Sequence, residues 1–302
     1  MTRGQTTFLA LSLLSILALM ALAPTGPSAR ASERSPQPLS WHLNYGTAMD
    51  LAEKQGKLLF IYFYDSSDPN EQRQLVFERQ VLADPGVRIL LEKYVLLLQP
   101  TDGKIHSEGK IVRLLKDQSF YHMYNSPGVA IIDMAHRDKP YFRHLVSAFP
   151  FDDDHFYGIS RLKTILGLPS GSLTQRTLTY AVRIHPEHPA SADGKVDTSL
   201  ISFAEDHSQL MANIQVQGHH NWEQRFHEIA ARIPGELVPT EVAAESWPGQ
   251  SLVDAAIECV HSWRQSDGHW ESVRGRHPIF GFDMKRGRNG IWYATGIFGL
   301  RR

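Results

Sequence analysis

Cysteine is almost absent from this chain of 302 residues, which contains one, Cys259. A single thiol allows no disulfide within the chain and no Cys-x-x-Cys redox centre. An excess of one charge is also absent, because 31 lysines and arginines are balanced by 32 aspartates and glutamates. This balance provides no overall attraction to nucleic acid, so we expect no nucleic-acid partner.

A hydrophobic run long enough to span a membrane is lacking as well. The longest apolar stretch, Phe8 to Ala23, has about sixteen residues, whereas a membrane helix needs roughly twenty. Arg3 precedes this stretch, and Ala29-Arg30-Ala31 fits a cleavage site with small residues. We therefore predict a signal peptide over 1–31 and a mature protein without a membrane span, in the periplasm or secreted. An uncleaved anchor is the alternative.

The length favours two domains, which we place at 32–169 and 170–302. In the first, apolar runs of strand length alternate with helical patterns, which predicts an α/β layer fold. Leu58 to Phe63 is apolar throughout, as in a strand buried on both faces. The expected helices are 41–55, 71–82, 114–124 and 152–166, and the expected strands are 58–63, 94–98, 128–133 and 141–146.

The first segment resembles exported thioredoxin-like domains. The likeness rests on the stretch Ala52 to Leu59 and on Asn125-Ser126-Pro127-Gly128 before an apolar strand. In that family a cysteine pair would fall near Ser67 to Glu71, where this chain has none. A thioredoxin needs a reactive thiolate, so the composition excludes thiol–disulfide exchange. The resemblance leaves a scaffold, or a surface near Pro127 that captures a protein partner.

The second segment is predicted to be an α+β sandwich. Leu168 to Thr177 is interpreted as a junction. Helical patterns follow over 197–216, 223–233 and 252–263, and Asn289-Gly290 between two apolar runs predicts a hairpin. His207, on an apolar helix face, is interpreted as a hydrogen-bonded core residue.

Candidate site residues lie at both ends of the predicted helix 252–263. Glu245 precedes it, His269 follows it, and His219 and His220 lie upstream. Two histidines and a glutamate form either a divalent-metal set or, without metal, a proton relay. Trp222, Trp247 and Trp270 each lie within three residues of a candidate, so they could wall a cleft for peptide, glycan or lipid, although core packing is the default for tryptophan.

This segment resembles the superfamily of cysteine-rich secretory, antigen 5 and pathogenesis-related proteins, called CAP or SCP, in its bacterial secreted form. Ala244-Glu245-Ser246 matches the family's Gly-Glu-Asn box, and the stretch from Trp263 to His269 matches its Trp-x-x-Ser-Pro-Gly-His box. The upstream histidine corresponds to His219 or His220, with His219 preferred. A second family glutamate is absent, because Ser266 stands there.

The resemblance implies a reduced cavity of two histidines and one glutamate that can bind a divalent cation, zinc being favoured. We therefore expect a binding protein for an unidentified ligand. One alternative is a metal-assisted hydrolase acting on peptide or cell-envelope material, with Glu245 as general base. The other is a purely structural cluster of His219 or His220, Glu245 and His269.

Overall fold

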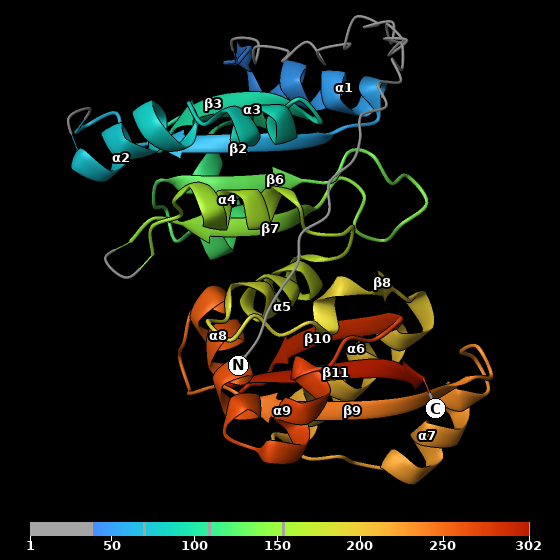
Figure 1. The fold of residues 1–302 in the computed structure, drawn as a ribbon. Helices are drawn as coiled ribbons and strands as arrows, with labels where there is room; N and C mark the ends of the chain where they lie inside the picture. The colour runs from blue at the N-terminus through green and yellow to red at the C-terminus, as the bar shows by residue number, and fades with distance from the viewer. Residues whose placement is uncertain (1–38, 69–70, 108–109, 153–154, 302) are drawn as a thin grey trace, which may run out of the picture. The chain divides into compact units, whose positions relative to one another are not determined.

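The computed structural model describes residues 39–68, 71–107, 110–152 and 155–301 (Figure 1). The predicted signal peptide, 1–31, lies outside the described residues. Within the described part, the chain forms two sheets of a mixed α/β fold and a separate pair of short strands, β4 (Lys104–Ser107) and β5 (Lys110–Arg113).

The first sheet has five strands in the order β1-β3-β2-β6-β7. These are β1 (Trp41–His42), β3 (Tyr94–Pro100), β2 (Leu58–Tyr64), β6 (Gly128–Ile132) and β7 (Leu145–Pro150). β1 and β2 run parallel to β3, whereas β6 is antiparallel to both β2 and β7. The central strand β2 has five consecutive buried residues, which confirms the predicted strand buried on both faces.

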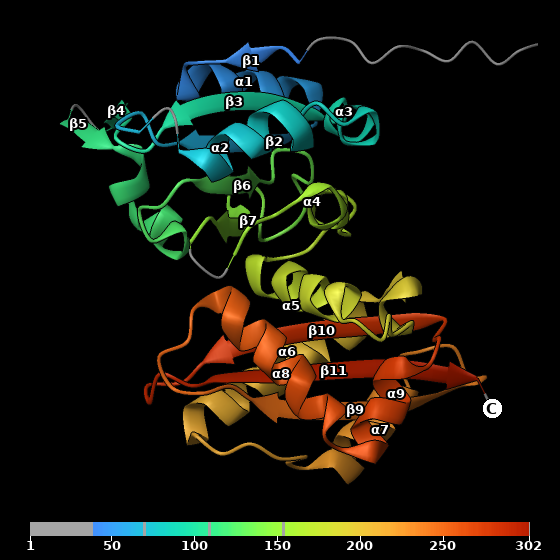
Figure 2. The same ribbon diagram turned by 60° about the vertical axis from the view of Figure 1, so that its left-hand side comes forward.

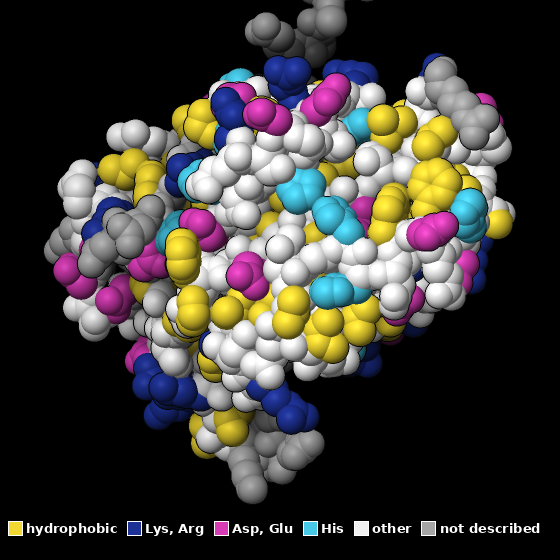
Figure 3. Space-filling model, turned by 90° about the horizontal axis from the view of Figure 1, so that it is seen from below, with side chains coloured by type: hydrophobic (Ala, Val, Ile, Leu, Met, Phe, Trp, Pro, Cys, Tyr) yellow, Lys and Arg dark blue, Asp and Glu magenta, His cyan; other side chains and the backbone are white. Residues whose placement is uncertain are grey.

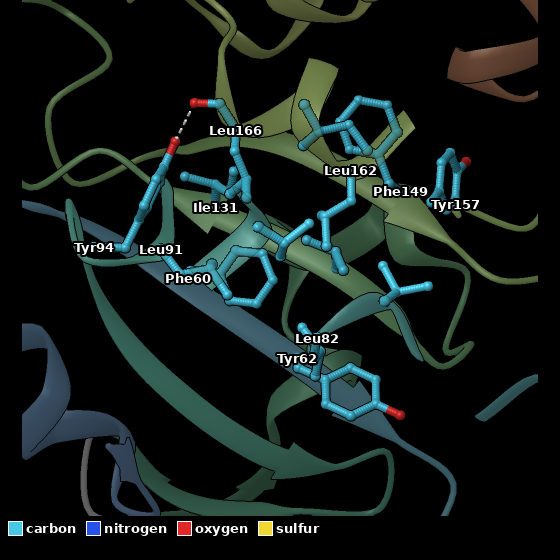
Figure 4. Close-up of a cluster of buried hydrophobic side chains, with 14 of the residues drawn as sticks. Phe60, Tyr62, Leu82, Leu91, Tyr94, Ile131, Phe149, Tyr157, Leu162 and Leu166 are labelled. Carbon is cyan, nitrogen blue, oxygen red and sulfur yellow. Dashed lines mark hydrogen bonds between the residues drawn. The ribbon is translucent and has the colours of Figure 1, made fainter. Parts of the chain in front are cut away.

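Alternating side chains of β2 enter two separate cores, as the period of a strand requires. Phe60 and Tyr62 join one cluster, and Leu59, Ile61 and Phe63 join the other. Figure 4 shows the first cluster, in which the Tyr94 hydroxyl donates to the Leu166 carbonyl at 2.8 Å. The surrounding helical elements are α1 (Tyr45–Gln55), α2 (Gln72–Val76), η1 (Phe77–Val81), α3 (Pro85–Leu91), η2 (Leu114–Lys116), η3 (Gln118–Met123) and α4 (Ile159–Leu166).

The second sheet has the order β8-β10-β11-β9. Its strands are β8 (Lys195–Val196), β10 (Ile279–Arg286), β11 (Trp292–Arg301) and β9 (Leu237–Glu245). β10 and β11 are antiparallel and are joined through Asn289-Gly290, with Gly290 at a φ of 79°, so the predicted hairpin is confirmed. This positive φ explains the glycine, which alone adopts it without strain.

Helices cover both faces of the second sheet (Figure 2). They are α5 (Leu173–Ile184), α6 (Thr198–Ile214), α7 (Trp222–Ala230), α8 (Leu252–Arg264) and α9 (Asp267–Arg274), with a short turn η4 (Ser191–Asp193) after α5. α5, α8 and α9 pack with Val242 and Phe282 on one face, and α6 and α7 pack with Ile297 on the other. Cys259 is fully buried on α8.

Several predicted elements differ from the structure for local reasons. The expected helix 114–124 is two short 3-10 turns, because Asp117 caps Ser119 and Tyr124 adopts a left-handed conformation at φ 52°. The expected strand 141–146 begins at Leu145 instead, since Arg143 at φ 64° completes a turn in front of it. The expected junction 168–177 already contains the start of α5, which a Ser172–Gln175 capping box fixes.

The described residues form one compact unit, with α5 next to the first sheet. The Tyr180 ring of α5 lies 4.7 Å from the Phe149 ring of β7. Arg176 of α5 is 2% exposed and donates to the Ser147 hydroxyl and to the Leu168 and Pro169 carbonyls. The predicted boundary between 169 and 170 falls beside these contacts and stays a prediction. No described helix is both long and apolar enough for a membrane crossing.

His155 also connects the segment after β7 to α8. Its Nδ1 lies 2.8 Å from Asp152 and its Nε2 lies 3.1 Å from Asp254. The hydrogen bond to Asp254, together with the charge of Asp152, raises the pKa of His155 although burial opposes the shift. The imidazolium is therefore stabilised by the folded state.

We predict that His155→Gln destabilises the protein in a pH-dependent way. The folded pKa exceeds the unfolded value of about 6.5, so the stabilisation is complete below that pH and is lost as pH rises through the folded pKa. We expect the free energy of unfolding to fall by about 2 kcal/mol at pH 5.5 and by less at pH 9, measured by urea denaturation. The control is His144→Gln, at an exposed position; an equal loss at both pH values for His155→Gln contradicts the assignment.

Candidate functional site

Two histidines from distant segments meet beside the second sheet. His219 lies in the turn between α6 and α7, and His269 is the third residue of α9. Their Nε2 atoms are 3.0 Å apart. The His219 side chain is 40% exposed, so solvent reaches the pair. Figure 3 shows histidine side chains gathered near the middle of the face that lies lowest in Figure 1.

The carboxylate behind this pair belongs to Glu241, in the middle of β9. Its side chain is 1% exposed. Oε1 accepts hydrogen bonds from His219 Nδ1 at 2.9 Å and from Arg225 Nη2 at 2.8 Å, and Oε2 accepts from Arg225 Nη1. Both oxygens are thus occupied by partners from the α6–α7 side of the sheet. We call His219, Arg225, Glu241 and His269 the histidine–glutamate cluster.

The charges in this cluster follow from its hydrogen bonds. Burial raises the pKa of Glu241, but Arg225, His219 and His207 more than offset that effect and hold the pKa below its ordinary value. Glu241 is therefore an anion, and it accepts a hydrogen bond from the protonated Nδ1 of His219. Burial and the neighbouring His219 lower the pKa of His269, so its ring is neutral at pH 7.

The tautomers follow from this arrangement. With its proton on Nδ1, a neutral His219 presents a lone pair at Nε2 toward His269. Two lone pairs facing each other at 3.0 Å would repel, so either a proton on His269 Nε2 or a cation must lie between them. The carboxylate–histidine arrangement is the one that orients imidazole ligands in metal sites.

His207 lies beneath the cluster. It is 1% exposed, and its Nδ1 is 3.1 Å from the Thr295 hydroxyl and 3.4 Å from Glu241 Oε2. Burial lowers its pKa to about 4, so the ring is neutral. The interpretation of His207 as a hydrogen-bonded core histidine agrees with these contacts.

Glu245 lies apart from the histidine pair, contrary to what the sequence analysis expected. It is exposed at the last position of β9, four residues after Glu241 and thus about 13 Å along the strand. Among the described residues it forms no hydrogen bond or ion pair with either histidine. No described contact joins His220 to the pair; its Nε2 donates to the Val216 carbonyl at 3.1 Å, and its ring lies 6.1 Å from the His207 ring.

The three candidate tryptophans lie in different surroundings. The Arg225 guanidinium lies over the Trp222 ring at 5.3 Å, next to the histidine–glutamate cluster. Trp270 is 5% exposed, and its indole donates to Glu187 at 3.0 Å. Trp247 is 65% exposed in the loop after β9. They do not share one cleft wall.

The donor set of the cluster is small. Among the residues that the structure describes, no three His, Cys, Asp or Glu side chains are arranged to hold a metal ion. The histidine pair supplies two nitrogens. Two nitrogens on one tetrahedral zinc lie about 3.3 Å apart, which is close to the observed separation of 3.0 Å. The separation of the two nitrogens therefore allows either a proton or a cation between them.

Glu241 and Arg225 were missed by the sequence analysis, which chose Glu245 as the carboxylate of the site. The available signal was a single charged residue, Glu241, within the mostly apolar stretch Val238 to Ala244. A charge in a buried strand needs a partner. The sequence does not say that this partner is Arg225, because α7 reaches β9 only through the tertiary fold.

Comparison with known proteins does not assign the chain to a family. No protein-family model matches the chain, and no curated protein matches it. Among solved structures, it is similar to an outer surface protein from Borrelia burgdorferi, with 17% identity, a TM-score of 0.29, and coverage of 36% of this chain and 78% of that one. It is also similar to a thioredoxin from Thermus thermophilus, with 29% identity, a TM-score of 0.22, and coverage of 32% of this chain and 65% of that one.

We predict that Glu241→Gln destabilises the protein strongly and that Glu245→Gln does not. Removing the buried carboxylate leaves Arg225 without its partner, which costs about 3–5 kcal/mol, whereas the exposed Glu245 contributes within about 0.5 kcal/mol. The folded pKa of Glu241 is lowered, so its contribution is present above about pH 4.3 and is lost as pH falls further. Chemical denaturation at pH 7 checks this; similar losses for the two variants would show that Glu241 is not the anchoring carboxylate.

Proposed function

We propose that 170–302 is a CAP-type domain that binds an extracytoplasmic ligand, together with a divalent cation held by His219 and His269. The observation that carries the proposal is the 3.0 Å contact between the two Nε2 atoms, with His219 Nδ1 fixed by Glu241. Both histidines come from the segments that the resemblance marks. The resemblance implies that the box glutamate, Glu245, belongs to the cavity, and we assign this role to Glu241 instead.

The layering of the second sheet supports this proposal. A CAP-type sandwich requires helices on both faces of an antiparallel sheet. Here β10, β11 and β9 are antiparallel, with β8 parallel to β10, and α5, α8 and α9 lie on the face opposite α6 and α7. The first sheet supports a thioredoxin-like domain in 32–169, because three parallel strands are followed by antiparallel β6 and β7. Pro127 directly precedes β6, as the resemblance expects.

The chain's own residues define how the pair would bind a cation. Arg225 balances the charge of Glu241, and Glu241 in turn keeps the proton of His219 on Nδ1. The low pKa of His269 keeps its ring unprotonated and available at neutral pH. A bound cation such as zinc would supply Lewis acidity, with His219 and His269 as its protein ligands.

The hydrolase alternative has less support from the geometry. It assigned the general base to Glu245, which is exposed at the end of β9. Glu241 does not replace it, since both of its oxygens already accept hydrogen bonds from Arg225 and one accepts from His219. A binding role requires no free base, so we propose binding. Export rests on the predicted signal peptide.

We predict that wild-type protein binds Zn²⁺ at one site and that His219→Ala and His269→Ala each weaken it at least about tenfold. Both imidazoles are solvent-accessible, so these variants should fold. Calorimetric titration with Zn²⁺ at pH 7.5 measures this, and affinity should fall as the pH is lowered because protons compete with the cation for imidazole nitrogens.

The matched control is His220→Ala, which removes the adjacent imidazole that faces Val216 instead. We expect its zinc affinity to equal that of wild type. Unchanged binding by His269→Ala, or a loss in His220→Ala as large as in His219→Ala, would contradict the assignment of the pair.

A further inference from the structure

A second surface with ligand-binding character lies away from the histidine–glutamate cluster. Three large aromatic side chains are exposed on segments that contact one another: Trp247 at 65%, Tyr121 at 50% and Tyr124 at 42%. Tyr121 and Tyr124 come from η3 and the residue that ends it, in the first half of the chain, and Trp247 comes from the loop between β9 and α8. Exposed aromatic rings that gather from separate segments mark interaction sites more often than scattered ones do.

Ordered contacts hold these segments beside one another. The Trp292 carbonyl accepts a hydrogen bond from the amide of Ser246, next to Trp247, and the Trp292 amide donates to the Ser246 hydroxyl. The Trp292 ring lies 5.9 Å from that of His122. His122 lies between the two tyrosines, whose rings are 5.9 Å apart. The Tyr124 hydroxyl approaches the Leu252 amide at 3.4 Å, at the start of α8. Buried Trp292 and half-buried His122 thus connect the segments that carry the exposed rings.

The loop that carries Trp247 is itself fixed. The Trp247 amide donates to the Gln250 side chain at 2.9 Å, and the Gly249 amide donates to the Gly290 carbonyl of the hairpin turn at 3.1 Å. The rings are therefore presented by anchored backbone, so little conformational entropy is lost when a ligand covers them.

One positive charge belongs to this surface. Arg286 is exposed and is the cross-strand neighbour of Trp292, so the two side chains leave the sheet on the same face. Burial, and to a lesser extent the charge of Arg286, lowers the pKa of His122 to about 4. Among the described residues Arg286 forms no ion pair, so its guanidinium is available to an anion.

We propose that Trp247, Tyr121, Tyr124 and Arg286 form an aromatic platform that binds a glycan bearing carboxylate groups. Exposed aromatic faces stack on the apolar C–H faces of pyranose rings, and a guanidinium binds a carboxylate in a bidentate manner. A single unpaired arginine suits sparse carboxylates better than a nucleic-acid backbone, which requires several cations. The ligand bridges residues from both halves of the chain, so neither half holds the complete site.

This inference does not rest on the histidine pair, since none of the platform residues contacts it. The experiment uses the full chain without its predicted signal peptide. Binding to polygalacturonate, hyaluronan and alginate is measured by calorimetry, with methyl-esterified polygalacturonate as the neutral counterpart of the same sugar. Oligo(dT) and phosphatidylglycerol vesicles test the two competing kinds of anionic partner.

We expect at least one of the acidic glycans to bind, and its affinity to fall about tenfold or more in Trp247→Ala and in Arg286→Gln. Wild-type protein should bind the methyl ester as weakly as the Arg286→Gln variant binds the acid form. Arg288→Gln, which removes another exposed arginine two residues further on, is the matched control and should bind as wild type does. His269→Ala should also bind the glycan normally, which separates this test from that of the proposed function.

The proposal is overturned if none of the acidic glycans binds, or if the methyl ester binds as tightly as the acid. It is equally overturned if Arg288→Gln weakens binding as much as Arg286→Gln, or if the platform variants lose binding only to oligo(dT) or to vesicles. All four variants alter exposed or half-exposed side chains, and circular dichroism verifies that each is folded.

Discussion

The buried ion pair between Glu241 and Arg225 is the interaction on which the rest of the site depends. A carboxylate that is 1% exposed in the middle of a strand would be strongly unfavourable without a cationic partner. Arg225 supplies that partner from α7 and lies over Trp222, so the pair also fixes α7 against β9. The oxygen shared with His219 then fixes one imidazole, and His269 from α9 completes the contact.

Much of the fold was predictable from local signals. The apolar run 58–63 indicated a strand buried on both faces, Asn289-Gly290 indicated the hairpin, and the stripe from Leu252 to Trp263 indicated α8. Elements were misplaced where a single capping or turn residue decides the outcome, as with Asp117, Arg143 and Ser172. Side-chain caps of this kind shift boundaries by several residues without changing the hydrophobic pattern.

The site was less predictable than the fold. His219 and His269 were found because each follows a glycine in a recognisable box, but the carboxylate was placed at Glu245. Glu241 and Glu245 have the same parity in β9, so the strand pattern alone does not distinguish them. The choice depends on where α7 brings Arg225, which is a tertiary property. The aromatic platform is hidden for the same reason, since Tyr121 and Trp247 are far apart in the sequence.

The central claim is that an ionised Glu241 holds the proton of His219 on Nδ1 and thereby turns its Nε2 toward His269. Long-range ¹H–¹⁵N correlation spectra of the imidazole side chains, recorded on metal-free protein at pH 7.5, report this directly. The account predicts that His219 is in the Nδ1–H tautomer and that His220, which donates from Nε2 to Val216, is in the other. Observation of the Nε2–H tautomer for His219 would contradict it.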